Sequence, residues 1–148
     1  MRVLGIDVGD RRVGLAISDA TRTLARPLIT LSVSSRADAI DRVAAAIAQL
    51  SAEDDGLSRI VVGMPARLDG SPSEGTARAA AFVDALKTRT ALPIVTEDER
   101  LSSREAESRL AVRERDWRKR KEKLDAAAAA VILQDYLDRT RPAGQPEQ

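Results

Sequence analysis

The chain contains no cysteine and no histidine among its 148 residues. The lack of cysteine excludes disulfides, thiolate metal sites and cysteine nucleophiles. The lack of histidine excludes a serine–histidine triad, histidine-ligated zinc and the usual general base near neutral pH. Hydrolytic chemistry in this protein must therefore depend on carboxylates, lysine, hydroxyl groups or a hard cation held by oxygen ligands.

Aromatic residues and long apolar runs are also scarce. There is one Phe, one Trp and one Tyr, so stacking of bases on aromatic side chains is not expected to be the main means of holding nucleic acid. No apolar run is long enough to span a bilayer, and the chain begins directly with a strand pattern rather than a signal peptide. We therefore expect a cytoplasmic protein that makes no contact with a membrane.

The net charge is only +1, but it is unevenly distributed. Residues 109–123 contain eight basic and three acidic side chains, which gives this segment a local charge of +5. Such a cluster favours a polyanionic partner despite the near-neutral total.

Hydrophobic periodicity predicts one mixed α/β domain over residues 1–139, followed by a flexible tail over 140–148. The expected strands cover residues 2–8, 13–18, 27–33, 59–63 and 92–96. The expected helices begin at Ser34 or Ser35, at Ala77, at about Ser103 and at Lys123. Residues 64–75 and the basic stretch before Lys123 are expected to be loops. An opening meander followed by strand–helix alternation indicates a sheet with right-handed crossovers.

Asp7 is the first candidate for chemistry. It lies inside an apolar strand, in Gly5-Ile-Asp-Val-Gly9, where a carboxylate is costly unless something compensates it. The neighbouring glycines would let a ligand or metal come close to the backbone. The alternative is an aspartate that accepts hydrogen bonds from the turn, although turn aspartates usually follow the strand.

The second candidate is the acidic run Glu97-Asp98-Glu99, followed by Arg100. Three successive acids repel one another, and the end of a strand favours them only with a cation nearby. Strand alternation sends Glu97 and Glu99 to one face and Asp98 to the other. A solvated acidic loop is an equally good interpretation of this run taken alone.

The third candidate is Asp125, which precedes five alanines. An acid in the first turn of a helix also caps it and complements its dipole, so a structural role is equally plausible. The functional interpretation is that the alanines let this helix lie close to the sheet and bring Asp125 to the other acids. Three acids at the ends of three elements form the pattern expected for two hard cations that bridge a phosphate.

Two further segments could contact substrate. The loop after residue 63 could hold phosphates through Arg67 and Ser71, because such loops often bind ligands in open sheets. The basic run beside Asp125 could draw a polyanion to an acidic metal site. A surface connection and a solvated face are the respective alternatives.

These residues resemble the YqgF/RuvX family of pre-16S rRNA nucleases and Holliday-junction-resolvase-like proteins. The matching motifs occur in the family's order and cover the chain to about residue 139. They are Gly-Ile-Asp-Val-Gly at 5–9, Arg-Val-Gly-Leu-Ala at 12–16, Ser18-Asp19, Val-Val-Gly-Met-Pro at 61–65, Asp-Gly-Ser at 69–71, Asp-Glu-Arg-Leu-Ser-Ser at 98–103 and Asp-Ala-Ala-Ala-Ala at 125–129.

The resemblance implies an RNase H-like fold, with a five-stranded mixed sheet and helices on both faces. It implies a catalytic and metal-binding triad of Asp7, Glu99 and Asp125, with Asp98 as the rival for the middle position, and Mg²⁺ or Mn²⁺ as cofactor. The residues expected to contact nucleic acid are Arg11, Arg12, Arg67, Ser71, Arg100, Arg118, Lys119, Arg120 and Lys121. Asp10, Glu97 and the serine pair Ser102-Ser103 depart from the family pattern.

The resemblance also implies a hydrolase that cuts phosphodiester bonds by a two-metal-ion mechanism. Its expected substrate is the 5′ end of precursor 16S rRNA. The alternatives are resolution of branched DNA, which would favour a homodimer, and a non-catalytic RNA-binding role in ribosome assembly. The Gly-Ile-Asp-Val-Gly motif also opens the actin-like and sugar-kinase ATPases, but those proteins need a second such domain, for which this chain is too short.

Overall fold

The protein is described by a computed structural model over residues 1–65, 71, 73–98 and 117–140, and within 117–124 only the backbone is described. Five strands form one sheet in the order β3-β2-β1-β4-β5. The elements are β1 (Arg2–Val8), β2 (Arg12–Ser18), β3 (Ala25–Ser32), α1 (Arg36–Ala52), β4 (Leu57–Met64), α2 (Glu74–Leu86), β5 (Ile94–Asp98) and α4 (Trp117–Thr140). The first three strands are antiparallel, whereas β4 and β5 run parallel to β1 and β4 respectively. The predicted five-stranded mixed sheet is confirmed.

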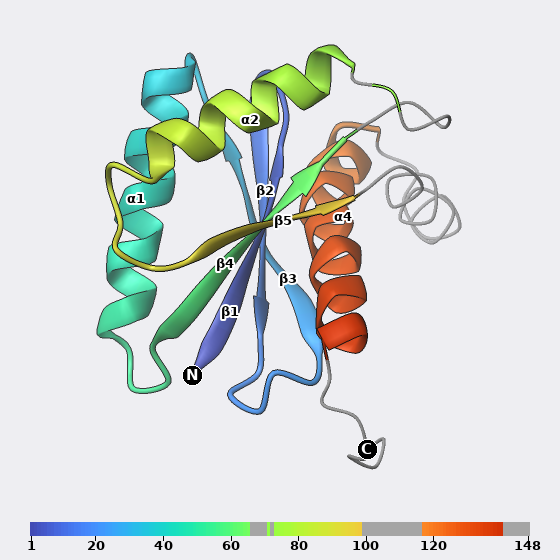
Figure 1. Cartoon of the computed structure of the whole chain (residues 1–148). Helices are drawn as coiled ribbons and strands as arrows, with labels where there is room; N and C mark the ends of the chain where they lie inside the picture. Colours follow the sequence, from blue (N-terminus) through green and yellow to red (C-terminus); the bar gives the residue numbers. More distant parts are fainter. Residues whose placement is uncertain (66–70, 72, 99–116, 141–148) are drawn as a thin grey trace.

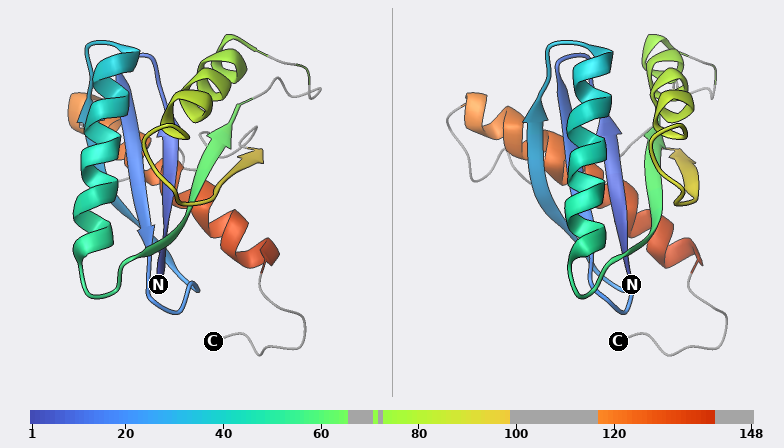
Figure 2. Two further views of the ribbon diagram at one scale, coloured as in Figure 1. Left: turned by 60° about the vertical axis from the view of Figure 1, so that its left-hand side comes forward. Right: turned by 90° about the vertical axis from the view of Figure 1, so that its left-hand side faces the viewer.

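Helices cover both faces of this sheet, as predicted. Helices α1 and α2 lie on one face and α4 crosses the other (Figures 1 and 2). Alternation along β1 divides the core accordingly: Leu4 and Ile6 pack in the cluster beneath α1 and α2, and Val3 packs in the cluster beneath α4. Among the described helices, none is long and apolar enough to cross a membrane.

Capping residues explain where two of the helices begin. The Ser35 side chain accepts a hydrogen bond from the Asp38 backbone N–H, which confirms the predicted start of α1. Helix α2 begins at Glu74, three residues before the predicted start, because Ser73 and Thr76 form a reciprocal capping box. The sequence did not reveal this box because a threonine replaces the usual glutamate or glutamine.

Other predicted boundaries are also wrong, by one or two residues in β2, β3, β4 and β5 and by six residues at the start of α4. Strand β5 continues through Glu97 to Asp98, because its pairing with β4 extends to Met64. Helix α4 begins at Trp117 rather than Lys123, since a run rich in lysine and arginine is itself compatible with helix. The helix expected near Ser103 and the tail beyond residue 140 lie outside the described residues.

Arg2, which is 9% exposed, stabilises the end of the sheet at which β1 begins. Its guanidinium donates to the Leu50 and Gly56 carbonyl oxygens and pairs with Glu53 at 2.9 Å. These contacts satisfy carbonyls at the end of α1 and tie that helix to the start of β1. This end is therefore built for stability, and the candidate catalytic residues lie at the other end.

Candidate active site

Helix α4 meets the sheet through small residues. A Cβ added to Gly5 would lie 2.8 Å from the Leu133 Cβ, and one added to Gly14 would overlap the Asp125 carbonyl group and lie 2.9 Å from the Ala126 nitrogen. Ala126 and Ala129 are buried in this contact. Because neither glycine carries a side chain, the helix backbone lies almost directly on β1 and β2. The close approach expected from the alanine run is therefore present.

The pairing of β1 with β2 shows that Asp7 points to the face of the sheet that α4 covers. Asp7 pairs with Gly14 across the antiparallel β1–β2 ladder, and residues directly opposite each other point to the same face. Gly5 is two positions before Asp7 and also faces α4. Asp7 therefore points to the face on which Asp125 packs against Gly14, so both acids are neighbours of Gly14 on the same face of the sheet. The fold thus brings the two most separated acids of the predicted triad to one face.

A basic side chain accompanies these acids. The Arg12 Nε donates to Asp125 Oδ2 at 2.6 Å, and the two side chains are 29% and 25% exposed. Arg12 begins β2 and shares a face with Gly14, two residues later. The guanidinium partly compensates the Asp125 carboxylate. Sequence reasoning assigned Arg12 to substrate and did not anticipate this pair, because nothing in a single sequence links positions 113 residues apart.

The acids of β5 divide between the two faces of the sheet. Glu97 is 12% exposed and accepts two hydrogen bonds from the Arg139 Nη2 on α4, at 2.7 and 3.0 Å. These hydrogen bonds, with the attraction to Glu97, raise the pKa of Arg139. Ile94 packs toward α1 and α2 whereas Val95 packs toward α4. Alternation therefore assigns Asp98 to the face opposite Asp7, and Glu99 lies outside the described residues.

The donor chemistry of this face fits a hard divalent cation. Asp7 and Asp125 supply two carboxylates, and oxygen ligands are what Mg²⁺ and Mn²⁺ prefer. A third acid is not added by the described part of the chain, in which no group of three or more potential ligands is found. The remaining predicted ligand, Glu99, belongs to the segment that follows β5.

The comparisons with known proteins identify the family. A family model described as RuvX, Holliday junction resolvase, matches residues 1–139. The chain belongs to the RuvX family. Its relatives include the "Putative pre-16S rRNA nuclease" of Anaeromyxobacter dehalogenans strain 2CP-1, which is 44% identical over 142 residues, covering 96% of this chain and 100% of the relative. The protein of the same description from Chloroflexus aggregans is 43% identical over 139 residues, 94% of each chain.

Solved structures support the fold of this RuvX protein. RuvC of T. thermophilus, in complex with a Holliday junction substrate, matches with a TM-score of 0.55 and 16% identity, covering 95% of this chain and 96% of RuvC. A second T. thermophilus RuvC structure gives a TM-score of 0.51 at 16% identity, covering 94% and 96%. The RNase H-like fold predicted from the motifs is confirmed.

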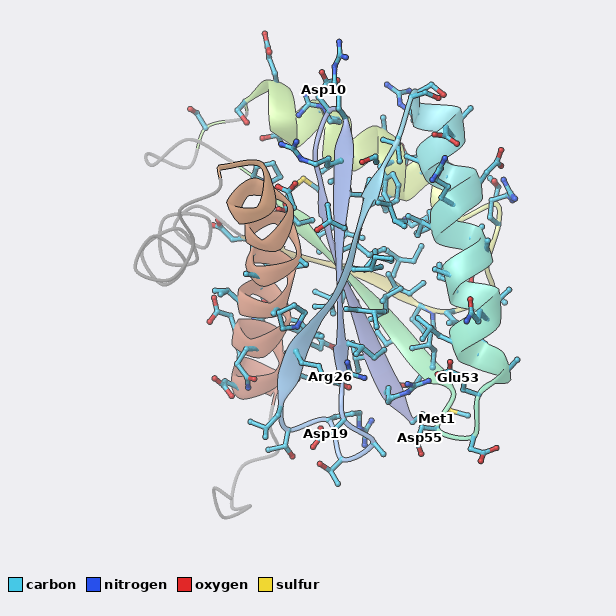
Figure 3. All side chains as sticks on the ribbon, turned by 180° about the vertical axis from the view of Figure 1, so that it is seen from behind. Met1, Asp10, Asp19, Arg26, Glu53 and Asp55 are labelled. Carbon is cyan, nitrogen blue, oxygen red and sulfur yellow. The ribbon has the colours of Figure 1, made fainter. Side chains whose placement is uncertain are left out.

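The RuvX motif Ser18-Asp19 lies away from the candidate site. It lies where β2 ends, at the end of the sheet opposite to the end that carries Asp7, and Asp19 is labelled there in Figure 3. The Ser18 hydroxyl accepts from the Val3 backbone N–H at 2.8 Å, and Asp19 Oδ1 accepts from the Thr23 N–H at 2.8 Å. This motif shapes the β2–β3 turn.

The predicted nucleic-acid contacts are only partly described. Arg11 is exposed beside the turn that follows β1, and Ser71 is half-buried. Arg67 and Arg100 lie outside the described residues. Residues Arg118, Lys119, Arg120 and Lys121 form part of the α4 backbone, and their side chains are not described.

Proposed function

We propose that this RuvX protein is a metal-dependent nuclease that hydrolyses phosphodiester bonds with Asp7, Asp125 and Glu99. The observation that carries the proposal is that Asp7 and Asp125 are both neighbours of Gly14 on one face of the sheet. Two carboxylates from separate elements, one near the end of β1 and the other inside α4, in a chain without histidine, are suited to hydrolysis assisted by divalent cations rather than by an imidazole base.

The three acids act as metal ligands in this proposal. Asp7, Glu99 and Asp125 would together hold the cations, with Asp7 as the central ligand. Bound Mg²⁺ or Mn²⁺ would supply an activated water and stabilise charge on the leaving oxygen. The close packing of α4 on β2 holds Asp125 in position, because the helix backbone cannot approach any nearer.

Strand alternation supports Glu99 over Asp98 as the third acid. Glu97 faces α4, as its bond to Arg139 demonstrates, and Asp98 belongs to the other face. By the same alternation, position 99 would share the face of Asp7 and Asp125 if the pattern of β5 were continued by one residue. Glu97 shares that face but is already neutralised by Arg139.

Basic residues around the acids would bind the phosphate backbone. Arg12 is in contact with Asp125, so it is close enough to meet a phosphate that bridges the acids. Arg11, Arg67, Ser71 and Arg100 are proposed to extend this contact. The run at residues 118–121, at the start of α4, would add sequence-independent attraction to a nucleic acid.

The proposed substrate is precursor 16S rRNA, which is cut during maturation of its 5′ end in the cytoplasm. The support is the description carried by relatives that match 96% and 94% of this chain. Branched DNA is the second candidate, because the family model is described as a Holliday junction resolvase. Cleavage of precursor rRNA and of a synthetic four-way junction by one preparation separates the two, and a resolvase would act as a homodimer that cuts both strands.

The decisive experiment compares Asp7→Asn, Glu99→Gln and Asp98→Asn in Mn²⁺ and in excess chelator. Asp7→Asn and Glu99→Gln should abolish cleavage without loss of folding or of most nucleic-acid binding, whereas Asp98→Asn should retain it. Cleavage that persists in Asp7→Asn or in chelator would refute the proposal. If the wild-type protein binds RNA but never cuts it, the protein is instead a non-catalytic assembly module.

A further inference from the structure

A second concave site lies on the other face of the sheet, between the first turns of α1 and α2. It is a cavity of about 410 Å³, bounded by the turn after β1 and by both helices. Val8, whose side chain belongs to the core beneath α1 and α2, forms part of its wall. Since Val8 follows Asp7 directly, this cavity and the candidate active site lie on opposite faces of the same strand end.

Two arginines line this cavity from different helices. Arg36 is the first residue of α1 and is exposed, and Arg78 lies one turn into α2 and is half-buried. Within the described residues, neither guanidinium has an ion-pair or hydrogen-bond partner. The half-buried guanidinium of Arg78 would gain from an anionic partner, because it is partly removed from water. With the exposed Arg36 at the same cavity, it favours a phosphate, whose geometry suits arginine.

The rest of the lining indicates more than a bare phosphate. Val33, Ala39 and Phe82 give the cavity an apolar wall, which suits the flat face of a nucleobase. Asp10 and Glu74 line it as well, and carboxylates of this kind accept hydrogen bonds from ribose hydroxyls. Their negative charges would also repel a simple anion, which offers them no hydroxyl group to bind.

We propose that the cavity between α1 and α2 binds one nucleoside monophosphate unit, with its phosphate held by Arg36 and Arg78. The volume lies within the range of roughly 300–1,000 Å³ found for small-molecule sites. The unit is either a free nucleotide or one residue of a single strand that passes over the turn after β1. Asp10, labelled at this end of the molecule in Figure 3, is where such a strand would cross from one face to the other.

The test measures binding to the full-length protein in EDTA, so that it does not depend on the proposed nuclease chemistry. Calorimetry with AMP, UMP and inorganic phosphate should give binding of both nucleotides that is at least tenfold tighter than binding of phosphate. Arg78→Gln and Arg36→Gln should each weaken nucleotide binding about tenfold. Arg26→Gln is the matched control, because Arg26 is exposed, without a partner among the described residues, and lies toward the opposite end of the molecule (Figure 3).

A second pair of variants tests the cavity without changing charge. Ala77 is exposed and lines the cavity, whereas Ala80 is exposed on the same helix and does not. Ala77→Leu should fill the cavity and abolish nucleotide binding, and Ala80→Leu should leave it within twofold. Helix propensity changes little in either variant, so both should fold.

Three results would overturn the proposal, and one further measurement identifies the source of the ligand. The proposal is overturned if neither nucleotide binds at millimolar concentration, if phosphate binds as tightly as AMP, or if the control variants lose as much affinity as their partners. A short 5′-phosphorylated RNA identifies the source of the ligand. If it binds at least tenfold tighter than AMP and loses that affinity in Ala77→Leu, the unit belongs to a strand. If AMP binds as tightly as the RNA, the unit is a free nucleotide.

Discussion

The substitution Gly14→Ala tests the packing on which the candidate active site depends. The new Cβ would lie 2.9 Å from the Ala126 nitrogen and closer still to the Asp125 carbonyl group. Carbon atoms in ordinary contact are about 3.5–4.0 Å apart. All of these neighbours are backbone atoms, so no side chain can rotate away. The helix must therefore move from β2 by roughly 1 Å, and Asp125 moves with it away from Asp7.

This displacement has two separate consequences. Overpacking of this kind costs about 1–3 kcal/mol, part of which is offset by the smaller entropy of the unfolded chain when glycine is replaced. For a domain of this size, a kilocalorie corresponds to roughly 2–4 °C in Tm, so the Tm should fall by several degrees. A misplacement of about 1 Å in a catalytic group costs on the order of a hundredfold in rate, and affinity for Mn²⁺ should fall with it.

Gly5→Ala is the control for Gly14→Ala. Its Cβ would press on Leu133 at 2.8 Å and on the Ala129 carbonyl oxygen at 3.2 Å, which strains the same interface further along α4. Both variants should lose stability in guanidinium unfolding, but only Gly14→Ala should lose Mn²⁺ affinity measured by calorimetry. If Gly14→Ala binds Mn²⁺ and cleaves like the wild type, the position of Asp125 over β2 is not what assembles the acids.

Two further predictions concern single charged groups. Arg12→Gln removes the cation that contacts Asp125 at 2.6 Å and competes with any metal there, so Mn²⁺ affinity should rise several-fold while the KM for nucleic acid also rises; a fall in Mn²⁺ affinity would contradict this role. At Asp19, burial raises the pKa, but hydrogen bonds from Thr23, Thr21 and Leu24 outweigh it and lower the pKa below 3.8. The folded form therefore gains stability from this carboxylate above that pH and loses it as the pH falls through the lowered value. Asp19→Asn should be destabilised in urea unfolding at pH 7, by an amount that shrinks as the pH falls toward 2.5; a difference independent of pH would rule out the carboxylate's charge as the cause.

Local patterns in the sequence predict most of the secondary structure. The apolar runs of β1 and β4 and the serine at the start of α1 are short-range signals, and each gave the correct element. The extension of β5 to Asp98 could not be predicted, because it depends on pairing with β4, and acids in a row suggest a loop. The early start of α4 at Trp117 was missed because charge was taken as a sign of a loop.

The candidate site could be predicted only in part from the sequence. Motif resemblance indicated the acids, and the alanine run indicated that a helix lies close to the sheet. The sequence could not reveal that Gly14 is the contact point, nor that Arg12 pairs with Asp125 and Arg139 with Glu97. These pairs join residues from distant parts of the chain, and they follow only from how α4 crosses the sheet.

The end of β1 explains how one short strand can serve two surfaces. Successive residues of a strand point to opposite faces. Asp7 therefore points to the face that α4 covers, whereas Val8 lines the cavity between α1 and α2. The α4 side requires a close backbone contact, which the glycine at position 14 allows. The other side requires helices held far enough apart to leave about 410 Å³ between their first turns. Because the two requirements fall on different helices, the proposed metal binding at Asp7 and the proposed ligand binding beside Val8 should respond independently to substitutions in α4 and α2.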